Sequence, residues 1–194
     1  MLTYGIRHAA LGLAFILAAA VAAGGIAGAQ TTVTVSGSLA SVTASSATIT
    51  TATGNTEVII TDKTRVLRRL PATLADIKTG TFLAVTSSKG AGGSLTAVSI
   101  TILDAIKATA RHVNYTMESG NQMTNADVIS VVTAASGRTL KMNYEDQAIT
   151  ILVPDKTPIS RILPAKLSDL KPGQHVTVRG SSYGGITATS IVIQ

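Results

Sequence analysis

The chain has 194 residues, a formal net charge of +6 and no cysteine, which excludes a disulfide-stapled scaffold and thiol chemistry. Aromatic residues make up only 3%, so the core must be built from Val, Ile, Leu and Ala. A modest positive charge without a long Lys/Arg run is compatible with an anionic partner and equally with a solvated surface.

The first 29 residues have the pattern of a secretory signal peptide. Arg7 precedes an apolar run over residues 9–26, and Ala27-Gly28-Ala29 supplies a small-x-small cleavage site. An uncleaved membrane anchor is the alternative, because the run of about 18 residues is close to the ~20 that span a bilayer. We predict cleavage after Ala29 and a periplasmic or secreted protein. Loss of Arg7 leaves fifteen basic against ten acidic residues, a net charge of +5.

A long internal repeat divides the rest of the chain. Residues 62–80 recur 93 positions later at residues 155–173, with the shared skeleton DKT, R, LPA and L-x-D-[IL]-K-x-G. Each unit is larger than the ~20–50 residues of a solenoid repeat, so the pattern indicates duplicated domains. We predict repeat 1 over residues 30–104, a polar linker over 105–126 that forms a long loop, and repeat 2 over 127–194.

Within each unit, β-branched residues alternate with polar ones, which is typical of strands. We expect strands near residues 33–44, 48–53, 57–61, 82–87 and 95–103, and near 128–134, 139–143, 148–153, 175–179 and 186–193. Five strands with a helical turn between the third and fourth are the ground plan of a small OB-type barrel. The predicted fold is therefore all-β, with two tandem five-stranded OB-like barrels; a pair of small β-sandwiches is the alternative.

The expected helical turn lies in the L-x-D-[IL]-K motif of each unit. Thr73 or a preceding residue can cap its start, where Asp76 (and Asp169 in the second copy) would also stabilise the exposed amides. Gly80 and Gly173 fit the left-handed position that follows a helix.

The order of these motifs resembles a secreted bacterial family known as domain of unknown function five-six-six-six. The residues that carry the resemblance include Val35-Ser36-Gly37-Ser38-Leu39, Asp62, Thr64, Leu74, Asp76, Lys78, Gly80, Thr96 and Ala97, and in the second half Met123-Thr124-Asn125-Ala126, Gly137-Arg138-Thr139-Leu140, Val153-Pro154 and Leu170-Lys171-Pro172-Gly173. The resemblance covers nearly the whole mature chain. It implies a periplasmic or secreted double β-barrel and brings no reaction with it.

Catalytic and metal-binding patterns are weak. No Ser lies in a G-x-S-x-G elbow, and His112 and His175 are the two histidines outside the leader. His112, Glu118 and Asp127 in or beside the linker are the best metal ligands, a weak set because solvated loop residues explain them as well. We therefore expect no enzyme activity and no cofactor. An unfamiliar active site would need His175 and Asp169 in one pocket.

The basic residues suggest a binding role. We predict that Arg65, Arg68, Arg69 and Arg161 contact a partner, although a solvated surface explains them too. Nucleic acid is not expected, because single-strand binding needs aromatic stacking platforms that this chain lacks. The predicted function is a non-enzymatic exported binding or scaffold module of the bacterial cell envelope, whose partner is an unknown envelope protein or anionic polymer. The alternative is a periplasmic small-ligand or metal-ion carrier.

Overall fold

The computed structural model describes residues 31–134 and 137–194, so the predicted signal peptide lies outside the described residues. The fold is all-β, as predicted. Repeat 1 holds β1 (Thr31–Val42), β2 (Ser46–Thr51), β3 (Gly54–Ile59), β4 (Arg65–Pro71), β5 (Phe82–Lys89) and β6 (Leu95–Ile102). Then follow β7 (Val113–Thr116), β8 (Gln122–Ala134), β9 (Gly137–Tyr144), β10 (Gln147–Val153), β11 (Ile159–Ala165), β12 (His175–Ser182) and β13 (Ile186–Ile193).

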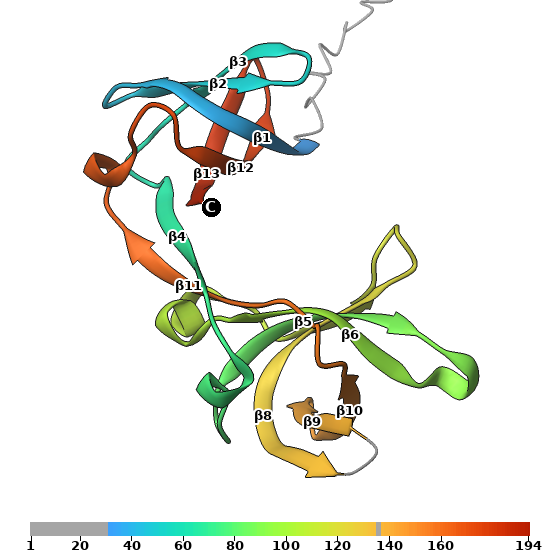
Figure 1. The fold of residues 1–194 in the computed structure, drawn as a ribbon. Coiled ribbons are helices and arrows are strands. Elements are labelled where there is room, and N and C mark those ends of the chain that lie inside the picture. Colours follow the sequence, from blue (N-terminus) through green and yellow to red (C-terminus); the bar gives the residue numbers. More distant parts are fainter. Residues whose placement is uncertain (1–30, 135–136) are drawn as a thin grey trace, which may run out of the picture.

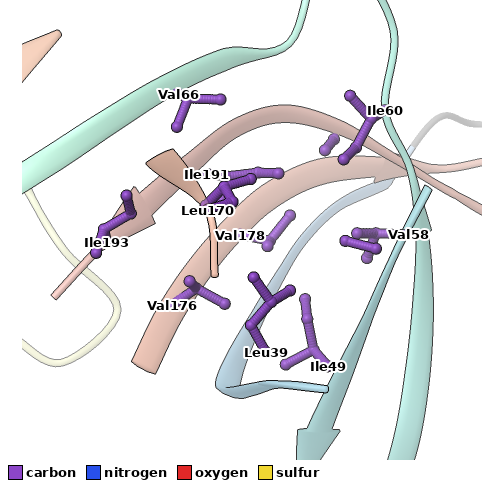
Figure 2. Packing of buried hydrophobic residues seen from close by; sticks show 12 residues of the cluster. Leu39, Ile49, Val58, Ile60, Val66, Leu170, Val176, Val178, Ile191 and Ile193 are labelled. Carbon is purple, nitrogen blue, oxygen red and sulfur yellow. The ribbon is translucent and has the colours of Figure 1, made fainter. Parts of the chain in front are cut away.

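The two ends of the chain together form one closed barrel, which we call the terminal module. Its strands pair in the order β12-β1-β2-β3-β13, and β13 pairs again with β12. Their inward-facing residues form one apolar core, and Figure 2 shows Leu39, Ile49 and Val58 directed toward Val176 and Val178. These side chains are at most 1% exposed. The alternation of apolar and polar residues along each strand therefore places one face inside the barrel.

The middle of the chain forms a second five-stranded unit, the central module. Its strands pair in the same cyclic order, β5-β8-β9-β10-β6, and β6 pairs with β5. A separate apolar core fills it, with Leu83, Val85, Leu140, Met142 and Ile151 fully buried. Figure 1 shows the two modules at opposite ends of the molecule, joined by β4 and β11.

Each module takes strands from both repeats. The first three strands of repeat 1 pair with the last two of repeat 2, and the first three of repeat 2 pair with the last two of repeat 1. Two tandem barrels with one repeat each, over residues 30–104 and 127–194, are therefore not what the strand pairing shows. The reason is local: after its third strand, each repeat continues as an extended strand, β4 or β11, into the other module.

Strands β4 and β11 form an antiparallel pair that we call the crossover ladder. Arg69 lies opposite Ile162, its own counterpart 93 residues later, so the repeats are related by a pseudo-twofold axis at this pair. On the outer sides β4 pairs with β13 and β11 pairs with β6, both in parallel. A small core of Leu67, Ile162, Phe82 and Leu103 packs at this junction. The ladder is thus an integral sheet rather than a pair of linkers.

The helical turns occur where they were expected, as short 3-10 turns η1 (Leu74–Asp76) and η4 (Leu167–Asp169). Two more are η2 (Ala91–Gly93) and η3 (Asp104–Thr109). Gly80 and Gly173 have positive φ angles of 84° and 88°, as predicted. Residues 105–126 differ from the expected long loop, because they contain most of η3, all of β7 and the start of β8.

Candidate functional site

The crossover ladder carries all four arginines that the sequence singled out, but it divides them between two faces. Successive side chains of a strand point to opposite faces, so Arg65 and Arg69 share one face of β4 and Arg68 takes the other. Arg68 lies opposite Leu163, and Arg161 lies opposite Leu70. Directly opposed residues point to the same face, so Arg161 shares the face of Arg68. The predicted basic group is therefore two separate pairs.

Arg69 is held inside the sheet. Its Nη1 donates to Ser160 Oγ at 2.6 Å and to Thr101 Oγ1 at 3.2 Å, which ties β4 to β11 and β6. Burial disfavours the charged guanidinium and lowers the pKa of Arg69 from its usual value. Both hydrogen bonds join strands across the ladder, so the contacts of Arg69 are structural ones.

Arg65 and Arg161 each have a partner within the chain. Arg65, which is exposed, donates from Nη1 to Oγ1 of Thr109, the last residue of η3, at 2.8 Å. Arg161 lies with its Nη2 2.6 Å from Asp76 Oδ1, and about one third of each side chain is exposed. The ion pair connects β11 to η1, the turn that follows β4, and thereby fastens the ladder to the central module.

Asp76 is more than an ion-pair partner. Its Oδ2 accepts hydrogen bonds from Thr73 N–H at 2.8 Å and from the Thr73 hydroxyl at 2.9 Å, and so caps η1. The backbone hydrogen bond from Thr73, then its hydroxyl and the charge of Arg161, lower the pKa of Asp76. Asp169 caps η4 in the same way, since its Oδ2 accepts from Lys166 N–H at 2.9 Å.

Arg68 is the pseudo-twofold counterpart of Arg161 and differs from it. The residue is half-buried, and within the described residues no hydrogen bond or ion pair joins its guanidinium to another side chain. On its face lie Leu163 and the 37% exposed Leu70, with Ile193 beside it on β13. The ladder therefore presents one unpaired cation framed by apolar side chains, with a second cation two residue pairs away on the same face.

Of the three candidate metal ligands in or beside the linker, only two lie close together. His112 Nε2 lies 3.2 Å from Asp127 Oδ2, while Lys107 Nζ lies 2.5 Å from Oδ1 of the same carboxylate. Burial raises the pKa of Asp127, but the hydrogen bonds and charges of Lys107 and His112 outweigh it and lower the pKa. Among the described residues, Glu118 makes no hydrogen bond or ion pair with either residue, and no group of three His, Cys, Asp or Glu could hold a metal. The ammonium of Lys107 occupies the position that a cation would need.

His175 stands at the start of β12 with an exposed side chain. Neither a hydrogen bond nor an ion pair joins that side chain to Asp169 in the described parts of the chain, where Asp169 caps η4. The structure therefore does not join His175 and Asp169 by a direct side-chain contact of the kind that an acid–base pair makes.

One concave site was not anticipated from the sequence. A shallow pocket of about 290 Å³ lies between η1 and the end of β10, and is lined by Thr73, Leu74, Arg138, Asp155 and Thr157 among others. Arg138 Nη1 lies 3.3 Å from Asp155 Oδ1 at its rim. Asp155 belongs to the repeated DKT motif, yet only the strand exchange brings it beside η1 of the other repeat.

Comparison with known proteins adds no assignment: no family model, no curated protein and no solved structure matches this chain. The resemblance to the family of unknown function therefore stays a prediction. Among the described residues, no helix is long and apolar enough to cross a membrane.

Proposed function

We propose that this protein is a non-enzymatic exported binding or scaffold module, and that it holds an anionic group of an envelope polymer or protein at Arg68. The observation that carries the proposal is the half-buried residue Arg68, whose guanidinium has no partner among the described residues, on the face that it shares with Arg161. Partial burial strengthens an electrostatic contact relative to one in open water.

The surroundings of Arg68 favour recognition of an anion that has an apolar neighbour. Leu70 and Leu163 lie on the same face, so an approaching carboxylate or sulfate could contact Arg68 while the group that carries it covers Leu70. Arg161 is already neutralised by Asp76, and it would add attraction at longer range rather than a direct contact. The rigid ladder fixes the position of both cations, which lowers the entropy that binding must overcome.

Binding to heparin, used as a soluble anionic probe, tests the proposal. Arg68→Glu is expected to weaken binding at least tenfold, with a steep dependence on salt because the contact is electrostatic. Arg111→Glu is the matched control, since Arg111 lies outside the ladder on the exposed surface and its substitution changes the net charge equally. A loss below threefold is expected there. Equal losses in the two variants would mean that net charge alone binds the polymer, and would contradict a role for Arg68.

A second candidate is a carrier of a small ligand, and the pocket beside η1 favours it. Its volume of about 290 Å³ is at the lower end of the range for ligand sites, and Arg138 with Asp155 offers both charge signs at the rim. Equilibrium dialysis with divalent metals and with a set of small zwitterions would test this candidate. Absence of binding at micromolar concentration would eliminate it.

A further inference from the structure

The first half of β1 has one side that no described strand covers. In the central module, residues 122–125 of β8 pair with β5 on one side and with β7 on the other. In the terminal module, the matching residues of β1 pair with β12, while β2 reaches β1 only from Ser38 onward. Val33 pairs with Gly180, and Gln122 pairs with Ser87. Because Gly180 follows Ser87 by 93 residues, the spacing of the repeat, Val33 is the counterpart of Gln122. The edge over residues 33–36 is thus the place that β7 occupies in the central module.

The side chains along this edge are suited to contact with an apolar neighbouring strand. Beneath β7, Gln122 and Thr124 are 8% and 0% exposed, and both donate to Asn114 Oδ1 of β7. Their counterparts on β1 are Val33 and Val35, which are only half-buried. A covering strand would therefore bury valine rather than satisfy amides and hydroxyls.

No described residue pairs with the backbone on the outer side of the same edge. Leu39 N–H donates to Gln174 on the β12 side, and alternate residues of a strand direct their backbone groups to opposite sides. The N–H and C=O groups of Thr34 and Ser36 consequently point to the uncovered side. Residues 32–37 contain no charge and no proline, the two features that usually protect an exposed edge from pairing.

We infer that this edge pairs with the same edge of a second copy of the chain, antiparallel and across a twofold axis. In a register centred on Thr34, Val33 of each copy lies opposite Val35 of the other, so both apolar residues meet on one face. The absence of charge means that the twofold axis brings no like charges together. Antiparallel pairing is also the direction in which β7 covers β8. The inference goes beyond the proposed function and does not depend on Arg68.

Sedimentation equilibrium of the full chain, over a range of concentrations, tests the inference. We expect a dimer at micromolar concentration. Thr34→Lys places two ammonium groups opposite each other at the centre of the pair and should raise the dimer Kd at least tenfold. Thr50→Lys is the control: the added charge lies on β2, which is paired on both sides, so the dimer should persist. Thr34→Pro removes the N–H that points to the open side and should also give a monomer.

Each result decides for or against the dimer. Loss of the dimer in both Thr34 variants, with the Thr50 control dimeric and all variants showing the same far-ultraviolet spectrum, supports it. A monomeric wild-type chain, or a dimer indifferent to Thr34→Lys, would overturn it. A monomer that binds a synthetic peptide with the β7 sequence would also overturn it, and would assign the edge to an extended segment of another protein.

Discussion

The terminal and central modules contain equivalent strands in the same cyclic order, yet they differ where β1 and β8 begin. In the central module β7 covers this strand, and a polar network of Asn114, Gln122 and Thr124 is buried beneath it. In the terminal module Val33 and Val35 stand there without a described covering strand. The difference teaches that, among the described residues, the two modules share their arrangement of five strands but not the edge beside it, which is covered in one module and uncovered in the other.

A second difference lies in the close approach of backbones within the barrels. A Cβ on Gly37 would lie 2.2 Å from the carbonyl oxygen of Thr50, and one on Gly180 would lie 2.4 Å from that of Thr187. The corresponding positions of the central module hold Ala126 and Ser87, both buried. The terminal module therefore packs its strands more tightly at these points than the central module does.

The largest expected effect concerns the exchange of strands between the modules. A protease site placed in the exposed turn between β7 and β8, at residues 118–120, would cut the chain between the repeats. Because each module contains strands from both halves, we expect the cut halves to remain one complex in size-exclusion chromatography until denaturant unfolds them. Two separate folded halves under native conditions would show that each repeat closes on itself.

An intermediate effect is expected from adding a methyl group to the tighter barrel. Gly37→Ala should lower the free energy of unfolding by about 1–3 kcal/mol, because the new Cβ meets backbone that cannot move aside. The reverse change in the other module, Ala126→Gly, should cost only ~0.5–1 kcal/mol from backbone entropy. Urea denaturation measures both. A Gly37→Ala chain as stable as wild type would remove the claimed difference in packing.

The smallest expected effect is a difference in Tm between variants of the two capping carboxylates, Asp76 and Asp169. Asp76→Asn weakens the cap, because the amide oxygen still accepts from Thr73 N–H but carries no charge, and it also removes the ion pair with Arg161. Asp169→Asn weakens only the cap, so Asp76→Asn should lower Tm further. The folded pKa of Asp76 lies below its unfolded value, so its stabilisation is present above pH ~4 and is lost as the pH falls through the folded pKa. The Tm gap between wild type and Asp76→Asn should therefore close on acidification. A gap that stays constant from pH 7 to pH 2 would contradict this assignment.

The sequence was sufficient to predict the strands that alternate strictly. All ten expected strands occur, and so do the turns at η1 and η4, because periodicity, capping residues and Gly80 or Gly173 are local signals. β4 and β11 were missed: the adjacent apolar residues Val66 and Leu67 face different cores, and Ile162 and Leu163 are likewise adjacent and apolar, which breaks the period of two.

The exchange of strands could not be read from the sequence. Similar repeats show which types of strand can pair, but not which copy supplies the partner. By pattern, Val35 fits equally well opposite Val178 or opposite Val85, the equivalent of Val178 in repeat 1. The choice depends on whether residues 60–72 turn back or stay extended. For the same reason the basic residues were predicted as one group: only the register of β4 against β11 shows that Arg68 and Arg69 face opposite ways.

The strand exchange is tested most directly by a pair of double-cysteine variants, since the natural chain has no cysteine. Ser36 Oγ lies 3.1 Å from Thr177 Oγ1 across β1 and β12, so Ser36→Cys with Thr177→Cys should oxidise to an intramolecular disulfide. Ala84 is the repeat-1 equivalent of Thr177, and Ser36→Cys with Ala84→Cys should stay reduced, because these residues lie in different modules. Mass spectrometry of the monomer after mild oxidation reads out both variants. An intramolecular disulfide in the second variant and none in the first would contradict the exchanged fold.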